Sequence, residues 1–218
     1  MITKTPGKGL NLARIQEIGG KCGSLISRFR YIDATGFRDV PERSRCQSDD
    51  MSEPEVLGQA KQLPGQIVPF TRNGPKPRTH TNLPHRQIDQ FPPPQIFYGL
   101  IDRCLKTPPM GLQESRLAPP ETIALWLPHD SAHGPASAFI DDHEFCHIHP
   151  LPEGSIHLTL PPAVARRAIE FGWAEPHTLT VTGFMAKTLV MVYAPRDDEE
   201  ADVVWNLIMA SFHFASGH

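Results

Sequence analysis

Three histidines and a carboxylate lie within fourteen residues, in the stretch EFCHIHPLPEGSIH at residues 144–157. His147 and His149 are separated by one residue, and His157 follows eight residues after His149. The segment between them, residues 150–154, is rich in proline and glycine, which is typical of a turn. Imidazole can hold a metal ion, transfer protons near neutral pH or hydrogen-bond an oxygen-rich substrate. This stretch is therefore the main candidate for chemistry.

Period-two alternation on both sides of this turn predicts a β-hairpin. On the first strand, the alternation places Phe145, His147 and His149 on one face and Glu144, Cys146 and Ile148 on the other. On the second strand, it places Ser155, His157 and Thr159 on a shared face. If the histidine-bearing faces coincide, the three histidines meet on one patch of the sheet.

Further candidates for a site follow the hairpin. Trp173 and His177 lie in the segment GWAEPH, directly after a predicted helix. Tyr193 and Arg196 lie where a predicted strand ends, which is a common position for site residues. Arg196 could instead simply pair with Asp197 or Glu199.

Composition excludes several classes of function. The net charge of −3 gives no electrostatic basis for binding nucleic acid or an anionic membrane. The four cysteines are scattered without a CxxC pair, so we expect reduced thiols and a cytoplasmic protein. No apolar run approaches the roughly 20 residues of a membrane span. The phosphate-binding, dinucleotide-binding, GxSxG and HExxH motifs are also missing from the sequence.

The rest of the chain predicts one domain behind a poorly patterned arm. The arm covers residues 1–50 and the domain residues 51–218. Apolar periodicity bounded by proline and glycine predicts helices at 53–62, 92–106, 163–172 and 197–214, strands at 122–127, 137–140 and 188–193, and loops at 63–85 and 107–120. This order predicts an α+β fold, with helices packed on one face of a mostly antiparallel sheet.

Several motifs together are specific enough to indicate a family. EFCHIHPLPEGSIHLTL, GWAEPH and VYAPRDDEEADVV occur in this order, and RQIDQ and TIALWLP precede them. This combination resembles the luciferase domain of bioluminescent fungi and of their many non-luminous fungal and bacterial relatives. The resemblance covers residues 75–215 and leaves residues 1–50 outside it.

The resemblance implies an oxygenase that acts on an enolic or phenolic small molecule such as a hydroxypyrone. Luminous members of the family add molecular oxygen to 3-hydroxyhispidin, a styrylpyrone, without a flavin or other known organic cofactor. They release carbon dioxide, light and caffeylpyruvate. They also carry an N-terminal membrane segment that this sequence lacks, so we expect a soluble relative that need not emit light.

A histidine would act as the base in such a reaction, and other residues would stabilise developing negative charge. The expected catalytic residues are His147, His149, His157, His177 and Arg196, and the expected substrate-binding residues are Glu144, Trp173 and Tyr193. Two alternatives stay open: a metal-dependent hydrolase or oxygenase that uses His147, His149 and His157 as ligands, and a non-catalytic binding module for a small molecule. Molecular oxygen is the expected co-substrate, and the apolar last helix would suit a homodimer contact.

Overall fold

The computed structural model describes residues 30–33, 36–39 and 64–218. The chain divides into two compact units, residues 1–58 and 59–218. In the first unit, β1 (Arg30–Asp33) and β2 (Gly36–Asp39) form an antiparallel hairpin that the sequence did not predict. The helix predicted at residues 53–62 lies outside the described residues.

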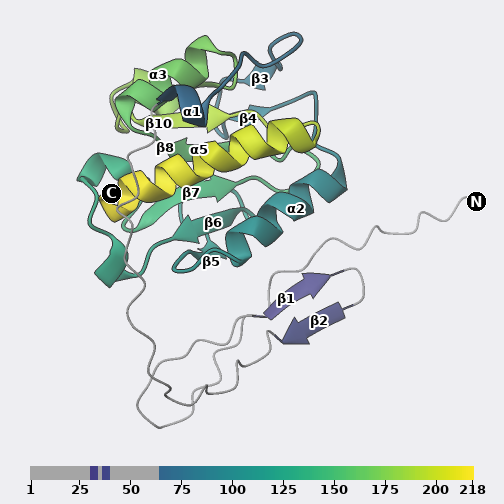
Figure 1. Cartoon of the computed structure of the whole chain (residues 1–218), viewed down its shortest axis with the longest axis vertical. Coiled ribbons are helices and arrows are strands. Elements are labelled where there is room, and N and C mark those ends of the chain that lie inside the picture. The colour runs from purple at the N-terminus through teal and green to yellow at the C-terminus, as the bar shows by residue number, and fades with distance from the viewer. Residues whose placement is uncertain (1–29, 34–35, 40–63) are drawn as a thin grey trace, which may run out of the picture. The chain divides into compact units, whose positions relative to one another are not determined.

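The second unit is built on one antiparallel sheet with the strand order β5-β6-β7-β8-β10-β9 (Figure 1). The strands are β5 (Gly111–Glu114), β6 (Ile123–Trp126), β7 (Glu144–Ile148), β8 (Ile156–Thr159), β9 (Ala174–Pro176) and β10 (Leu189–Val192). A separate two-stranded sheet pairs β3 (Thr79–His80) with β4 (Arg86–Gln87). The predicted α+β fold with a mostly antiparallel sheet is confirmed.

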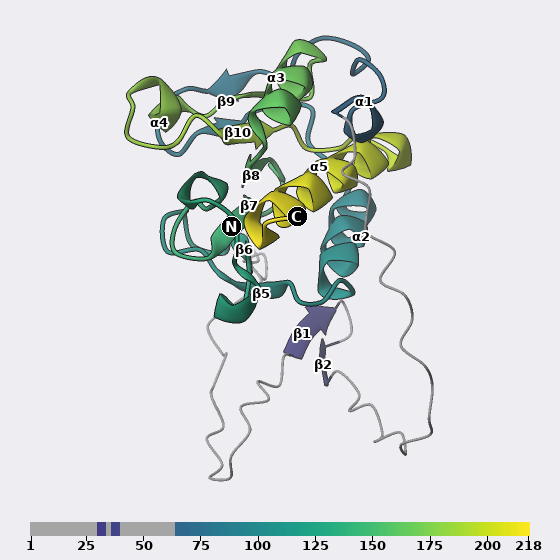
Figure 2. The same cartoon turned by 60° about the vertical axis from the view of Figure 1, so that its left-hand side comes forward.

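Figure 2 shows that one face of the sheet is covered by helices and that a short helix lies beyond the other face. The covering helices are α1 (Pro64–Ile67), α2 (Pro94–Leu105), α3 (Pro162–Glu170) and α5 (Asp198–Ser216). The short one is α4 (Thr178–Val181). None of the helices in the described part of the chain has both the length and the apolar character that crossing a bilayer requires.

The last helix, α5, has a sequence signal at each end. Asp197 caps its start by accepting a hydrogen bond from the backbone of Glu200. Gly217 ends it in the left-handed region, at φ +83°, where glycine is favoured. The apolar side chains of α5 are buried against β7 and β8, so the chain's own sheet covers the helix face that had suggested a dimer contact.

Three predicted elements differ from the structure, and the first is the loop predicted at 63–85, which contains α1 and β3. Residues 136–138 form a short 3₁₀ helix and not a strand, because Ala138 donates its N–H to the Pro135 carbonyl. The hydroxyls of Thr159 and Thr188 bond the carbonyls of Ala138 and Ser137, which therefore need no neighbouring strand. The loop predicted at 107–120 contains β5, an edge strand whose sequence GLQE has a single large apolar residue.

A bulge in β7 corrects the predicted alternation of the hairpin. Leu125 lies opposite Cys146 and Trp126 lies opposite Glu144, so Phe145 has no partner on β6. Phe145 turns toward α5, where its ring centroid is 6.1 Å from that of Phe212. Glu144 then lies on the same face as His147, with which it shares a hydrogen bond. The prediction that Phe145 shares the histidine face and Glu144 lies opposite it is wrong, because one extra residue reverses the period-two pattern.

Candidate functional site

The hairpin brings its three histidines together. In the register of β7 and β8, His147 lies directly opposite His157. The ring centroids of His147 and His157 are 4.8 Å apart, and those of His149 and His157 are 4.6 Å apart. All three side chains are at most 4% exposed. The predicted convergence of the three histidines on one patch is therefore confirmed, and the patch is the middle of the sheet.

Two further histidines complete the cluster. His177 follows β9, and its ring centroid is 4.5 Å from that of His157. His85 comes from the segment between β3 and β4, and its ring centroid is 5.1 Å from that of His177. Both are buried. Five imidazoles from four separate segments thus face one another.

These histidines form one wall of a cavity of about 450 Å³. Among the described residues they are its only polar side chains, and the other lining residues are apolar: Leu83, Pro84, Leu117, Ala118, Pro119, Ile140, Leu179, Phe184, Met185 and Leu189. Several apolar residues at the cavity are largely exposed, such as Leu83 and Leu117 at 61% and Phe184 at 77%. The cavity therefore suits a small apolar molecule that presents a polar group to the histidines.

Three of the histidines each have a ring nitrogen within hydrogen-bond distance of a carboxylate. Glu144 lies 2.6 Å from His147 Nδ1, and Glu153 lies 2.7 Å from His149 Nδ1. Glu175 lies 2.7 Å from His85 Nε2. Such a contact orients the ring and places its proton on the nitrogen that faces the carboxylate.

The carboxylates therefore decide which ring nitrogens keep a free lone pair. In neutral His147 and His149 the proton lies on Nδ1, so Nε2 is unprotonated. His147 Nε2 lies 3.0 Å from His157 Nδ1. His157 Nε2 and His85 Nδ1 are buried and have no hydrogen-bond partner among the described residues. Imidazole nitrogens with open lone pairs can accept a proton or bind a metal.

Burial sets the protonation of this cluster. Burial lowers the pKa of His147, and it lowers the pKa of His157 well below its usual value with the help of the neighbouring imidazoles. Burial also lowers the pKa of His177 to about 4. These three rings are therefore neutral at neutral pH. Burial raises the pKa of the adjacent Cys146 thiol well above its usual value, which argues against a thiolate nucleophile.

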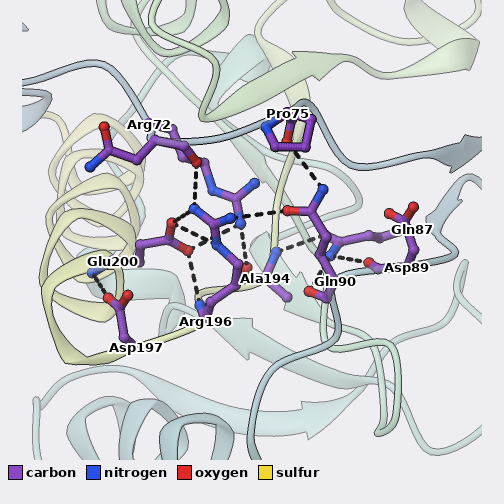
Figure 3. A network of polar contacts seen from close by, with 10 residues as sticks. Arg72, Pro75, Gln87, Asp89, Gln90, Ala194, Arg196, Asp197 and Glu200 are labelled. Carbon is purple, nitrogen blue, oxygen red and sulfur yellow. Dashed lines mark hydrogen bonds and ion pairs between the residues drawn. The ribbon is translucent and has the colours of Figure 1, made fainter.

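Trp173 and Arg196 were predicted for the site, but neither of them lines the cavity. Trp173 is buried and donates its indole N–H to the Phe70 carbonyl. Arg196 pairs with Glu200 and also contacts Gln90 (Figure 3). Arg196 therefore pairs with an acid, as the simpler interpretation expected, but this acid is Glu200 and not Asp197 or Glu199. The proposed roles of Trp173 and Arg196 stay predictions that this placement does not favour.

Tyr193 reaches the histidines only through a carboxylate. Its hydroxyl donates to Glu175 Oε2 at 3.0 Å, and the other oxygen of Glu175 contacts His85. Burial opposes the charge of Glu175, but hydrogen bonds from His85 and Lys76 outweigh it and lower its pKa to about 2. Tyr193 therefore helps to hold the carboxylate that orients a cavity histidine.

Sequence reasoning missed His85, Glu153 and Glu175. His85 lies in a proline-rich segment that resembles a solvated loop. Glu153 lies in the hairpin turn, four residues after His149, and that spacing could have suggested a carboxylate partner. Glu175 lies 90 residues from His85, and no local pattern connects the two.

Comparison with known proteins agrees with the motifs. Residues 142–211 match the Luciferase domain family. A luciferase from Armillaria gallica is 25% identical over 158 residues, which cover 66% of this chain and 59% of the relative. The match thus spans less than two thirds of the relative's length. No solved structure gave a significant match. The matched region contains the histidine hairpin and most of α5, so this part of the chain is similar to the luciferase domain of a fungal luciferase-like family.

Proposed function

We propose that this chain is an oxygenase that uses molecular oxygen to oxidise an enolic or phenolic ring, such as a hydroxypyrone, in the histidine-lined cavity. The observation that carries the proposal is an apolar cavity whose only polar side chains are histidines. Its volume of about 450 Å³ lies within the range typical of small-molecule sites. A flat ring would contact the apolar walls, and its acidic hydroxyl would face the imidazoles.

The base in this reaction is a cavity histidine with an open ring nitrogen. Two such nitrogens are buried without a partner in the described structure, His157 Nε2 and His85 Nδ1. His157 is connected through His147 to Glu144, and His85 contacts Glu175 directly. In both cases a carboxylate at the far end stabilises the imidazolium that forms when the ring accepts a proton.

The proposed steps balance protons and electrons. The ring hydroxyl gives its proton to the imidazole, and the resulting anion transfers two electrons to O₂ in single steps. A carbon–oxygen bond forms, and the oxygen molecule is reduced to a ring-bound peroxide. The imidazolium then returns its proton to the outer peroxide oxygen. The apolar walls limit access of water to the anion and the peroxide.

Similarity to the Luciferase domain supports the use of oxygen, because the relative from Armillaria gallica bears the name luciferase. A metal-dependent hydrolase or oxygenase is the second candidate. It is favoured by a separate observation: three ring nitrogens of the hairpin lie close together, with carboxylates behind two of the rings. A non-catalytic binding module is the third, and it would bind the same rings without consuming oxygen.

Oxygen uptake tests the proposal. The full chain is mixed with a panel of hydroxypyrones and phenols in air-saturated buffer, and oxygen is followed with an electrode while products are identified by mass spectrometry. On a substrate so found, we expect His157→Gln and His85→Gln each to lower kcat/KM by about 10²–10⁴-fold. His129→Gln, an exposed histidine outside the cavity, should leave it unchanged. Wild-type turnover by the double variant of His157 and His85 would contradict the proposal.

A further inference from the structure

We propose that His147, His149 and His157 bind one divalent transition-metal ion on the histidine wall of the cavity, with Glu144 and Glu153 as orienting carboxylates. The inference concerns the same site as the proposed function but does not depend on the reaction, because metal binding can be measured without a substrate.

The ligand atoms are already close to one another. One ring nitrogen from each of the three histidines lies within 4.8 Å of the other two. His147 Nε2 and His157 Nδ1 are 3.0 Å apart. Bonds of about 2.0–2.1 Å to a tetrahedral zinc ion would place ligand nitrogens about 3.3 Å apart. Small rotations of the buried rings would therefore bring the three nitrogens within bonding distance of one ion. The rings project from the end of β7 and from the paired β8, which hold them rigidly.

The carboxylates prepare two of the rings as ligands. Glu144 and Glu153 each hold an Nδ1 proton, which leaves Nε2 of His147 and His149 free for an ion. A histidine that contacts a carboxylate with one nitrogen and a metal with the other is a recurrent feature of metal sites. The bulge in β7 is required for this arrangement, because it alone places Glu144 on the face of His147.

The charges of these carboxylates point to an absent cation. Glu144 is fully buried, and in the described part of the chain neither Glu144 nor Glu153 forms an ion pair with lysine or arginine. Two other buried glutamates do have such partners: Glu175 pairs with Lys76, and Glu200 with Arg72. A buried carboxylate without a cation is costly. A divalent ion on the far side of the two imidazoles would offset both charges.

A second set of histidines is less suitable. Ring nitrogens of His85, His157 and His177 also lie within 4.8 Å of one another. However, His177 Nδ1 accepts the backbone N–H of Leu179 at 3.2 Å. Neutral His177 therefore carries its proton on Nε2, and neither nitrogen has a free lone pair. In the metal-bound protein, neutral His157 has no open nitrogen, because one nitrogen binds the ion and the other carries the proton. His85 stays outside the proposed ligand set and keeps an open Nδ1, so His85 is then the base of the proposed reaction.

The ligand type restricts the ion. Neutral imidazoles suit zinc, iron(II), copper or nickel, whereas calcium and magnesium prefer oxygen ligands. Three protein ligands leave at least one coordination position open toward the cavity, as in catalytic metal sites. The first-row divalent ions are therefore the class to test.

The test is a titration of the untagged full chain after removal of bound metal with a chelator. Cobalt(II) is added and visible absorption is recorded, because its d–d bands report coordination by the protein; zinc is then titrated by calorimetry. We expect one equivalent of each ion to bind. His149→Ala should weaken binding by 100-fold or more, whereas His177→Ala and His85→Ala should change it less than 5-fold.

Matched carboxylate variants separate a ligand set from a fold defect. Glu153→Gln should weaken metal binding by about 10–100-fold, and Glu175→Gln should leave it unchanged. Circular dichroism checks that each variant is folded, and Glu153→Gln replaces His149→Ala if the latter is not. Three outcomes would overturn the inference. The wild type could fail to bind metal, the Glu153 and His149 variants could bind it as tightly as wild type, or His177→Ala alone could lose binding. Metal binding without oxygen uptake would instead leave it intact and count against the proposed oxygenase.

Discussion

Two clusters on this domain both contain buried carboxylates, but they differ in how the charges of those carboxylates are paired. In the first, Glu200 accepts hydrogen bonds from Arg72 at 3.0 Å and from the backbone and Nε of Arg196 at 2.9 Å (Figure 3). Arg196 also donates to the Asn73 carbonyl at 2.6 Å. In the second, the histidine cluster, the carboxylates Glu144 and Glu153 contact neutral donors and imidazoles.

The two clusters differ in the partners of their carboxylates. The carboxylate of Glu200 has two arginines, and the guanidinium of Arg72 also lies over the rings of Trp173 and Tyr193, at 6.0 and 5.5 Å. In that cluster each charge has an opposite charge within the chain, although Nε and Nη1 of Arg72 are buried without a hydrogen-bond partner among the described residues. The cluster connects residues 72–90 to the start of α5. The histidine cluster has open nitrogens beside a cavity, and among the described residues no lysine or arginine pairs with its hairpin carboxylates. Charges that pair within the chain stabilise a fold, whereas unpaired carboxylates with open imidazole nitrogens at a cavity are suited to a ligand.

The largest effect on the free energy of unfolding should come from breaking the ion pairs of Glu200. Glu200→Gln keeps the shape of the side chain but leaves the charge of Arg72, whose side chain is 3% exposed, without its buried counterion. We expect the free energy of unfolding to fall by about 3–5 kcal/mol, measured by urea denaturation. Asp202→Asn, in an exposed ion pair with Arg103, is the control and should change it by less than about 1 kcal/mol. A similarly small loss in Glu200→Gln would show that this cluster does not stabilise the fold.

A smaller effect on the free energy of unfolding should appear when the pH is varied, and it should come from Glu175. This carboxylate contacts the cavity histidine His85 and the hydroxyl of Tyr193, whose ring packs against Arg72. Hydrogen bonds from His85 and Lys76 lower its pKa to about 2 in the folded protein, whereas an unfolded glutamate titrates near 4.3. Because the folded pKa is the lower one, the contribution to stability is present above the unfolded pKa. It is lost as pH falls from about 5 to about 2, and we expect of the order of 2 kcal/mol.

Glu175→Gln removes this titration, so the difference in unfolding free energy between wild type and variant should shrink as pH falls through that window. Metal-free protein is used, because bound metal would add its own pH dependence. A difference that stays constant from pH 6 to pH 3 would mean that folding does not lower the pKa of Glu175.

The elements that sequence predicted well have strong local signals. The hairpin has alternation and a turn, and α5 has a cap, acids in its first turn and a terminal glycine. The edge strands β5 and β9 were missed because they are short and only partly apolar. The alternation rule also failed at Phe145, since a bulge depends on pairing with β6 and leaves no mark in the sequence of β7 itself.

The part of the site that comes from one short stretch of sequence could be predicted. His147, His149 and His157 belong to one hairpin, and their facing follows from its register. His85 and Glu175 are brought there by the tertiary fold, so spacing along the chain could not connect them. Trp173 and Arg196 lie near the hairpin in sequence but their side chains pack on other parts of the domain, which shows the limit of reasoning from proximity along the chain.

The smallest effect is expected at Glu144, and it tests the comparison most directly. Glu144→Gln is the same chemical change as Glu200→Gln, in a carboxylate that is equally hidden from solvent. Here the lost charge has no lysine or arginine partner among the described residues, and an amide oxygen can still accept from His147 Nδ1. In the metal-free protein, we therefore expect the free energy of unfolding to change by less than about 1 kcal/mol.

With cobalt or zinc added, Glu144→Gln should bind about 10–100-fold more weakly than wild type, because His147 loses the carboxylate that orients it. A metal-free loss of about 3–5 kcal/mol, equal to that of Glu200→Gln, would mean that the chain already compensates this charge. The two clusters would then be the same kind of structure, and the histidine wall would need no cation. A small metal-free change together with weakened metal binding would separate them, because only a ligand from outside the chain would complete the second cluster.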